Sequence, residues 1–146
     1  MRGKCLCGEV EFELAGKILA LYQCHCSLCR KQSGSAASAA TIVAAEDFRW
    51  IRGKEVVGSW IKDTGFRSDF CRNCGSPVPN PLRTLPYVWI PAGLLEEREG
   101  LQIRLHVFYG SRAEWDTAKP EGTVYDGDTA ADMREFVRTL HRQVHD

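Results

Sequence analysis

The chain has 146 residues, with 19 Lys and Arg balanced by 19 Asp and Glu, a length that predicts one domain over residues 1–146 with a core of its own. Its neutral charge excludes the basic field of an electrostatic nucleic-acid binder, so no nucleic-acid partner is expected. Because no signal peptide is recognisable and no apolar run approaches the ~18 residues of a membrane helix, we expect a soluble cytoplasmic protein without a membrane partner.

The first half of the chain predicts strands. In residues 8–16, Val10, Phe12 and Leu14 alternate with glutamates, which is the period of a half-buried strand. Residues 18–24 predict a second strand that returns along the first. Residues 40–45, which are small, predict a third.

Further short strands are predicted at close spacing, over residues 47–51, 56–61, 66–70, 87–92 and 101–110. Glycine and proline turn signals separate them, which is an all-β rhythm. The chain has no GxGxxG or P-loop motif, which argues against a binding site for a dinucleotide or a nucleoside triphosphate.

The C-terminus predicts an amphipathic helix over about residues 129–145. Thr129 is the predicted N-cap, with Asp132 as a nearby acid, and His141 and His145 are expected to be solvated. We expect the helix to cap the sheet or to pack at a homodimer interface. Its predicted apolar face consists of Met133, Phe136, Val137, Leu140 and Val144.

The chain contains seven cysteines, a number that requires a structural or chemical explanation. Because their number is odd and the expected compartment is reducing, metal ligation is a better interpretation than a disulfide framework. They form three clusters: Cys5 with Cys7; Cys24, Cys26 and Cys29; and Cys71 with Cys74. The last pair is followed by Gly75, a common form of zinc knuckle.

Two groupings are possible. In the first, Cys71 and Cys74 join Cys5 and Cys7 in a four-thiolate site, which leaves the other three as a unit. In the second, Cys71 and Cys74 pair with Cys26 and Cys29. The first is favoured, because the 41 residues from 30 to 70 far exceed the usual ribbon loop of roughly 15–20.

Four segments, GKCLCGEVEFEL, CHCSLCRKQSGS, FCRNCGSPV and LHVFYGSRAEW, resemble in order the pattern of the glutathione-dependent formaldehyde-activating (Gfa, centromere-protein-V-like) family, over about residues 3–115. The resemblance implies a mainly β, β-tent (Mss4-like) fold of coiled antiparallel sheets with two zinc ions. It implies structural zinc at Cys5, Cys7, Cys71 and Cys74, and catalytic zinc at Cys24, Cys26 and Cys29. Where the family usually reads Ser-Lys-Ala-Pro-Trp, residues 111–115 are Ser-Arg-Ala-Glu-Trp, and the C-terminal helix lies outside the pattern.

Three thiolates leave a fourth position on zinc for water or substrate, and zinc favours a thiol there because it lowers the thiol pKa. The implied activity is that of a carbon–sulfur lyase or synthase, in which glutathione and formaldehyde give S-hydroxymethylglutathione. A small thiol and an aldehyde are the expected partners. The alternative is a non-catalytic, zinc-stabilised protein-binding module of the same fold.

Four residues near these motifs are candidates for other roles. His25 should point away from Cys24 and Cys26 in an extended backbone, which favours a role behind the metal or facing substrate. His106 is expected to be hydrogen-bonded within a sheet, with a position at the open site of the zinc ion or a role as a proton shuttle as the alternatives. Arg30 and Lys31 are candidate contacts for substrate carboxylates, with solvated surface charge as the alternative. The four tryptophans are expected in the core or a pocket wall.

Overall fold

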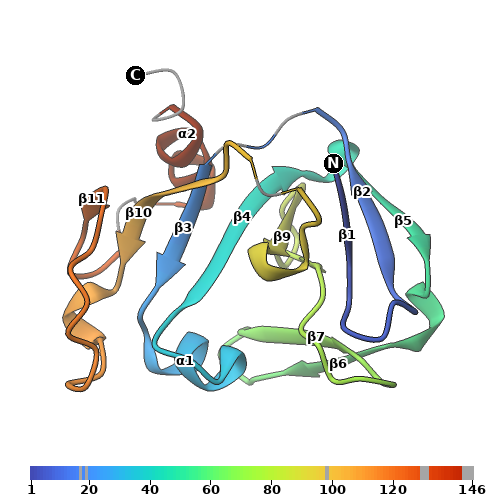
Figure 1. Ribbon diagram of the computed structural model, residues 1–146, viewed down its shortest axis with the longest axis horizontal. Coiled ribbons are helices and arrows are strands. Elements are labelled where there is room, and N and C mark those ends of the chain that lie inside the picture. Colours follow the sequence, from blue (N-terminus) through green and yellow to red (C-terminus); the bar gives the residue numbers. More distant parts are fainter. Residues whose placement is uncertain (17, 19, 98, 129–131, 143–146) are drawn as a thin grey trace. The chain divides into compact units, whose positions relative to one another are not determined.

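Short strands account for most of the regular structure in this computed structural model (Figure 1), which confirms the mainly β prediction. The structure describes residues 1–16, 18, 20–97, 99–128 and 132–142. It forms two compact units, Met1–Ile18 with Ile42–Glu99 and Leu19–Thr41 with Gly100–Asp146. The single domain over residues 1–146 stays a prediction.

A three-stranded antiparallel sheet begins the first unit, with the order β1-β2-β5. Its strands are β1 (Arg2–Lys4), β2 (Glu11–Leu14) and β5 (Phe48–Arg52). Phe12 and Leu14 are buried, which confirms the predicted alternation. The predicted pairing of residues 18–24 with this strand is wrong, because β1 and β5 occupy both of its edges.

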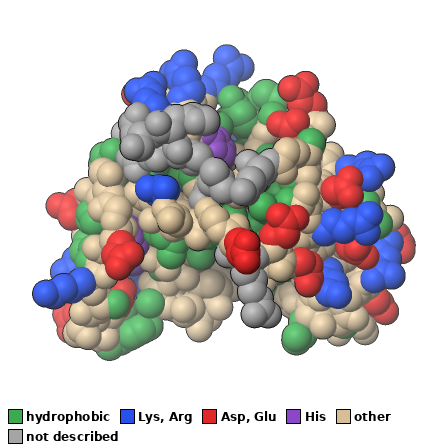
Figure 2. Space-filling model, turned by 45° about the horizontal axis from the view of Figure 1, so that its top comes forward, with side chains coloured by type: hydrophobic (Ala, Val, Ile, Leu, Met, Phe, Trp, Pro, Cys, Tyr) green, Lys and Arg blue, Asp and Glu red, His purple; other side chains and the backbone are tan. Residues whose placement is uncertain are grey.

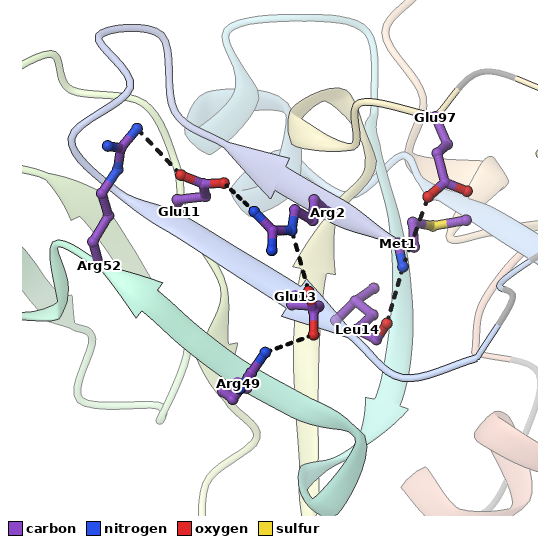
Figure 3. Close-up of polar contacts among 8 residues, drawn as sticks. All are labelled: Met1, Arg2, Glu11, Glu13, Leu14, Arg49, Arg52 and Glu97. Carbon is purple, nitrogen blue, oxygen red and sulfur yellow. Dashed lines mark hydrogen bonds and ion pairs between the residues drawn. The ribbon is translucent and has the colours of Figure 1, made fainter.

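The outer face of this sheet carries a ladder of alternating charges (Figure 3). Arg52 pairs with Glu11 at 3.2 Å, Arg2 bridges Glu11 and Glu13 at 3.4 and 3.1 Å, and Arg49 pairs with Glu13 at 2.7 Å. Hydrogen bonds from the Arg49 and Arg2 guanidinium groups lower the pKa of the Glu13 carboxyl. Exposed pairs of this kind contribute little stability individually, so the ladder mainly explains why the strand alternates with glutamates.

Two antiparallel pairs complete the regular strands of the first unit, β6 with β7 and β8 with β9. Their bounds are β6 (Val57–Ile61), β7 (Arg67–Cys71), β8 (Asn80–Pro81) and β9 (Tyr87–Pro91). Strand β7 ends on Cys71 and so delivers one candidate ligand. Single 3-10 turns lie in this unit at Ala45–Asp47, Lys54–Val56 and Ala92–Leu94, and another lies in the second unit at Tyr109–Ser111.

Gly53 follows β5 at a point where the chain comes very close to another backbone segment. Its φ is +83°, and a Cβ there would overlap the Glu9 carbonyl. Gly53→Ala is therefore expected to cost about 1–3 kcal/mol of unfolding free energy from crowding, in addition to about 1 kcal/mol from backbone strain. Gly16→Ala is the matched control, because Gly16 has a φ of +74° but nothing within 4 Å. Urea unfolding of both variants checks this, and equal losses would contradict it.

The second unit contains four neighbouring strand segments in the order β11-β10-β3-β4. They are β3 (Ala20–Cys24), β4 (Ser38–Ala44), β10 (Gln102–Val107) and β11 (Thr123–Val124), and β4 continues into the first unit beyond Thr41. Strands β3 and β4 are antiparallel, whereas β10 is parallel to both β3 and β11. The implied antiparallel pairing therefore holds for β3 with β4 but not for the two pairings of β10. No tight turn links β3 to β10, so nothing local forces the antiparallel direction.

Helix α2 (Met133–Arg142) confirms the predicted C-terminal helix and packs on β3. Phe136 and Leu140 are buried, and the Phe136 ring meets the Tyr22 ring edge-on with centroids 4.9 Å apart. The N-terminus is capped by Asp132, whose carboxylate accepts from the Glu135 N–H at 2.9 Å. Thr129, Val144 and His145 lie outside the described residues, and His141 is half-buried. The homodimer interface stays a prediction.

Acidic and basic side chains are interspersed on the right-hand side of the face shown in Figure 2, in line with the zero net charge. None of the helices that the structure describes is both long and apolar enough to cross a membrane.

Candidate functional site

The seven cysteines form two groups, and within each group the sulfurs lie within 4.8 Å of one another. One group consists of Cys5, Cys7, Cys71 and Cys74, all in the first unit. The other consists of Cys24, Cys26 and Cys29, all in the second. None of the seven forms a disulfide. This arrangement matches the first of the two groupings considered from the sequence.

The four-cysteine group is built from two tight turns. Cys5 and Cys7 lie between β1 and β2, and Cys71 ends β7. The turn after Cys71 closes through a 2.7 Å hydrogen bond from the Gly75 N–H to the Cys71 carbonyl, with Gly75 at a φ of +79°. Only glycine adopts this conformation without strain, so Gly75 lets Cys74 turn back towards Cys71.

Ser76 links the two turns of the four-cysteine group. Its Oγ accepts from the Leu6 N–H at 3.0 Å and lies 3.3 Å from the Cys74 sulfur. The hydroxyl hydrogen is therefore free to be donated to a Cys74 thiolate. Desolvation opposes ionisation, but the side-chain and backbone hydrogen bonds of Ser76 lower the pKa of Cys74 to about 6.

The sulfur spacing of this group fits a tetrahedral zinc ion. The Cys5 and Cys7 sulfurs are 3.6 Å apart, and those of Cys7 and Cys71 are 3.8 Å apart. Zn–S bonds of about 2.3 Å at tetrahedral angles place the sulfurs about 3.8 Å apart. Cys5 and Cys71 are buried in an apolar cluster with Val10 and Val78, as expected of a closed structural site.

The three-cysteine group lies where β3 passes into helix α1 (Ser27–Ser33). Cys24 ends the strand, Cys26 is the N-cap of the helix, and the Cys29 N–H donates to the Cys26 sulfur at 3.4 Å. The helix has no buried residue and ends at Gly34, whose φ is +64°. Because this helix buries no apolar face, its main structural effect is to fold Cys29 back onto Cys26.

The three thiols do not ionise alike. Hydrogen bonds from Cys24 and Cys29, and from the Cys29 and Leu28 backbone, hold the pKa of Cys26 far below its ordinary value. Hydrogen bonds with Cys26 and Cys29, together with burial, raise the pKa of Cys24. Binding a metal through all three sulfurs would release the protons that these thiols carry. Cys26 and Cys29 are only half-buried, so a ligand can approach them.

Arg30 and Lys31 lie in α1, directly after Cys29. Lys31 is exposed, while the Nε of Arg30 is buried and has no hydrogen-bond partner among the residues that the structure describes. Among the described residues neither side chain forms an ion pair. Their assignment to substrate carboxylates stays a prediction.

His25 and His106 form a buried pair. His25 Nε2 and His106 Nδ1 are 2.9 Å apart, and His106 Nε2 donates to the Glu121 carbonyl at 2.8 Å. Desolvation, followed by the charge of His106, lowers the pKa of His25. His106 is thus hydrogen-bonded at the sheet, as expected, and neither histidine belongs to a ligand group among the described residues.

Sequence reasoning missed a polar cluster beside this pair. Tyr109 packs edge-on against His25 with ring centroids 5.0 Å apart, and the Asp116 carboxylate lies 3.7 Å from His25 Nδ1. Their nearness to His25 follows from long-range strand pairing, which no local motif signals. The tryptophan expectation is wrong for Trp60 and Trp115, which are 55 % and 67 % exposed.

A family model described as glutathione-dependent formaldehyde-activating enzyme matches residues 1–111. The chain belongs to this family. The crystal structure of a Rhodobacter sphaeroides protein, a structural genomics target, is similar, with a TM-score of 0.56 and 29 % sequence identity. That match covers 67 % of this chain and 90 % of the other. A search of curated proteins gives no match. Both cysteine groups lie inside the Gfa-family match, whereas Asp116 and helix α2 lie beyond it.

Proposed function

We propose that this Gfa-family protein is a zinc-dependent carbon–sulfur lyase or synthase acting on a thiol adduct. The reaction would join glutathione and formaldehyde into S-hydroxymethylglutathione, or reverse that step. The observation that supports it most directly is the group of Cys24, Cys26 and Cys29, in which three sulfurs converge with two of them half-buried. Family membership supports the same activity.

The three thiolates of this group suit a zinc ion and would leave one of its four coordination positions open. Zinc held by three thiolates supplies a position at which a substrate thiol is kept deprotonated near neutral pH. The Cys29 N–H, which donates to the Cys26 sulfur, helps to keep that sulfur negative and correctly oriented. The four-cysteine group, by contrast, has a full set of ligands and suits a structural ion.

The chemical change is a simple addition. The glutathione sulfur forms a bond to the formaldehyde carbon, the carbonyl π pair moves to oxygen, and that oxygen takes up the proton that the thiol gave up. Arg30 and Lys31 follow the cluster, and we assign them to the carboxylates of the thiol. The Arg30 Nε, which has no hydrogen-bond partner in the described part of the chain, supports this assignment, because a buried guanidinium N–H favours a charged acceptor.

Family membership also implies the finer architecture, the β-tent fold, and we propose it for this chain. The mainly β architecture and the two cysteine groups support it.

The test is thiol entry at the three-cysteine group. In protein loaded with cobalt there, glutathione is expected to intensify the sulfur-to-cobalt charge-transfer band, whereas S-methylglutathione should leave it unchanged. Exchange NMR with labelled formaldehyde should show faster interconversion of glutathione and its hydroxymethyl adduct. Cys26→Ser should remove both effects. An unchanged band together with an unaccelerated reaction would refute the proposal and favour the non-catalytic binding module.

A further inference from the structure

Two of the large apolar side chains that the structure leaves exposed are neighbours on strand β6 (Val57–Ile61). Trp60 is 55 % exposed and Ile61 is 59 % exposed. Successive side chains of a strand point to opposite faces, so both faces of β6 are apolar at this end. The strand, VGSWI, contains no charged residue and no proline, the two features with which proteins commonly protect the edge of a sheet.

Strand β6 lies at the edge of a two-stranded sheet, in which it pairs with β7 (Figure 1). Among the residues that the structure describes, no strand pairs with the other side of β6. Strand β7 differs, because residues 76–78 bond to its far side. There the Val78 N–H donates to the Asp69 carbonyl at 3.0 Å. The open edge of this sheet is therefore that of β6.

The backbone groups that face the open edge follow from the pairing with β7. The Lys62 N–H donates to the Phe66 carbonyl at 2.8 Å, directly beyond the end of the strand. Bonded and non-bonded positions alternate along an antiparallel ladder, so Trp60 also bonds to β7. Ser59 and Ile61 therefore direct their N–H and C=O groups away from β7. Such a row of backbone groups is a template for a further strand.

A second copy of β6 fits this edge because the pattern of donors and acceptors is self-complementary. When two β6 strands run antiparallel about a two-fold axis beside Ser59, the two Ser59 residues exchange N–H···O bonds. The Ile61 N–H of each copy then faces the Val57 carbonyl of the other. The Val57 N–H is already bonded to the Lys54 carbonyl. All five residues of the strand overlap in this register.

The same register also matches the side chains. It places Trp60 of each copy opposite Gly58 of the other, at a non-bonded position where side chains of the two strands lie closest. The Phe70 ring lies over Gly58, since a Cβ on Gly58 would come within 2.9 Å of it. Each Trp60 ring would therefore pack against Phe70 of the second copy, which would cover its exposed surface.

Charges at the two ends of β6 favour a second copy over a strand from an acidic or a basic partner. Lys54 and Glu55 precede the strand, and Lys62 and Asp63 follow it. Antiparallel pairing brings the first two residues of one copy beside the last two of the other. Each lysine can then meet a carboxylate of the other copy, whereas a partner of one charge would match only one sign at each end.

We propose that the protein forms a two-fold homodimer in which two β6 strands pair antiparallel and join two β6–β7 sheets into one four-stranded sheet. Five-residue strands make a small interface, and interfaces below roughly 1,200 Å² hold weak complexes, so the dimer should depend on concentration. The interface differs from the C-terminal helix considered from the sequence. The inference does not depend on the proposed thiol chemistry.

Amide hydrogen exchange of the wild-type, zinc-loaded protein tests the pairing without any variant. In dilute protein, the Ser59 and Ile61 amides should exchange fast and the Trp60 amide, which bonds to β7, slowly. In concentrated protein, exchange at Ser59 and Ile61 should slow by at least about tenfold, with a smaller change at Trp60. Sedimentation velocity should show dimers over the same range and no larger species, because a two-fold contact closes on itself. A monomer at every concentration, or a dimer without this protection, would overturn the proposal.

Variants of residue 59 test the register, because this residue meets its own copy at the axis. Ser59→Lys and Ser59→Asp should each weaken the dimer by about fivefold, since like charges then face each other, and their equimolar mixture should associate more tightly than either alone. Trp60→Ser should weaken the dimer by about tenfold. Trp115→Ser, which changes an exposed tryptophan of the other unit, is the matched control and should not. A mixture that associates no better than its components, or a Trp60→Ser dimer as tight as the wild type, would show that the interface lies elsewhere and the proposal is wrong.

Discussion

Cys71→Ser is expected to leave the protein unfolded or insoluble. Cys71 is fully buried, and its group ties the N-terminal turn to a turn 64 residues later in the chain. Zinc binding at structural thiolate sites contributes an apparent free energy of about 10–16 kcal/mol to folding. This is comparable to the roughly 5–15 kcal/mol by which a whole domain is usually stable. A serine hydroxyl is a much poorer zinc ligand than a thiolate, so the fold would lose its main cross-link.

Cys29→Ser is the matched control, because it removes a thiolate from the other group. Cys29 lies in a helix that buries no residue, so the variant should fold and retain one zinc ion. Metal analysis and far-UV circular dichroism of both variants measure the difference. If both fold equally well, the assignment of structural and catalytic groups is wrong.

The cysteine grouping was the most predictable part of the site. Each cluster is local in the sequence, so spacing alone identifies Cys5 with Cys7, and Cys71 with Cys74, as ligand pairs. Which other cysteines join Cys71 and Cys74 depends on tertiary structure. The length of residues 30–70 only favoured Cys5 and Cys7 over Cys26 and Cys29. The structure places the two pairs together because β7 ends beside the turn between β1 and β2.

Local patterns also predicted most strands, yet they could not predict how the strands pair. The alternation over residues 8–16 shows which side chains are buried, but it carries no information about neighbouring strands. The parallel pairing of β10 with β3 depends on the long course of the chain between them. Helix α1 was missed because it has no apolar face, and only its cap residues, Cys26 and Gly34, mark its ends.

The polar cluster around His25 could not be predicted from the sequence for the same reason. His25 and His106 are 81 residues apart, and their contact exists only because β10 lies beside β3. Asp116 follows the segment that resembles the family, where a single acidic residue is unremarkable in a sequence. Its significance comes from its burial and from its position 3.7 Å from His25 Nδ1.

His106→Leu is expected to lower the zinc affinity of the three-cysteine group by about tenfold, the lower end of the effect of losing a supporting hydrogen bond. Two links hold the segment from Cys24 to Cys26 against β10. The His25 N–H donates to the Val107 carbonyl at 3.0 Å, and the His25 ring bonds to His106. Leucine would break the second link and leave the His25 and Glu121 groups unpaired, at a cost of about 1–3 kcal/mol each.

Competition with a chelator measures this effect separately for the two metal sites. The four-cysteine group should keep its affinity, because His106 belongs to the other unit. His106→Gln should restore part of the lost affinity, since its amide can accept and donate at the same time. His141→Leu, which changes a histidine on α2, is the control and should leave both sites unaltered. Equal losses at both sites would mean that His106 supports folding generally. No loss at either would mean that the backbone bond to Val107 is enough to hold the ligands in place.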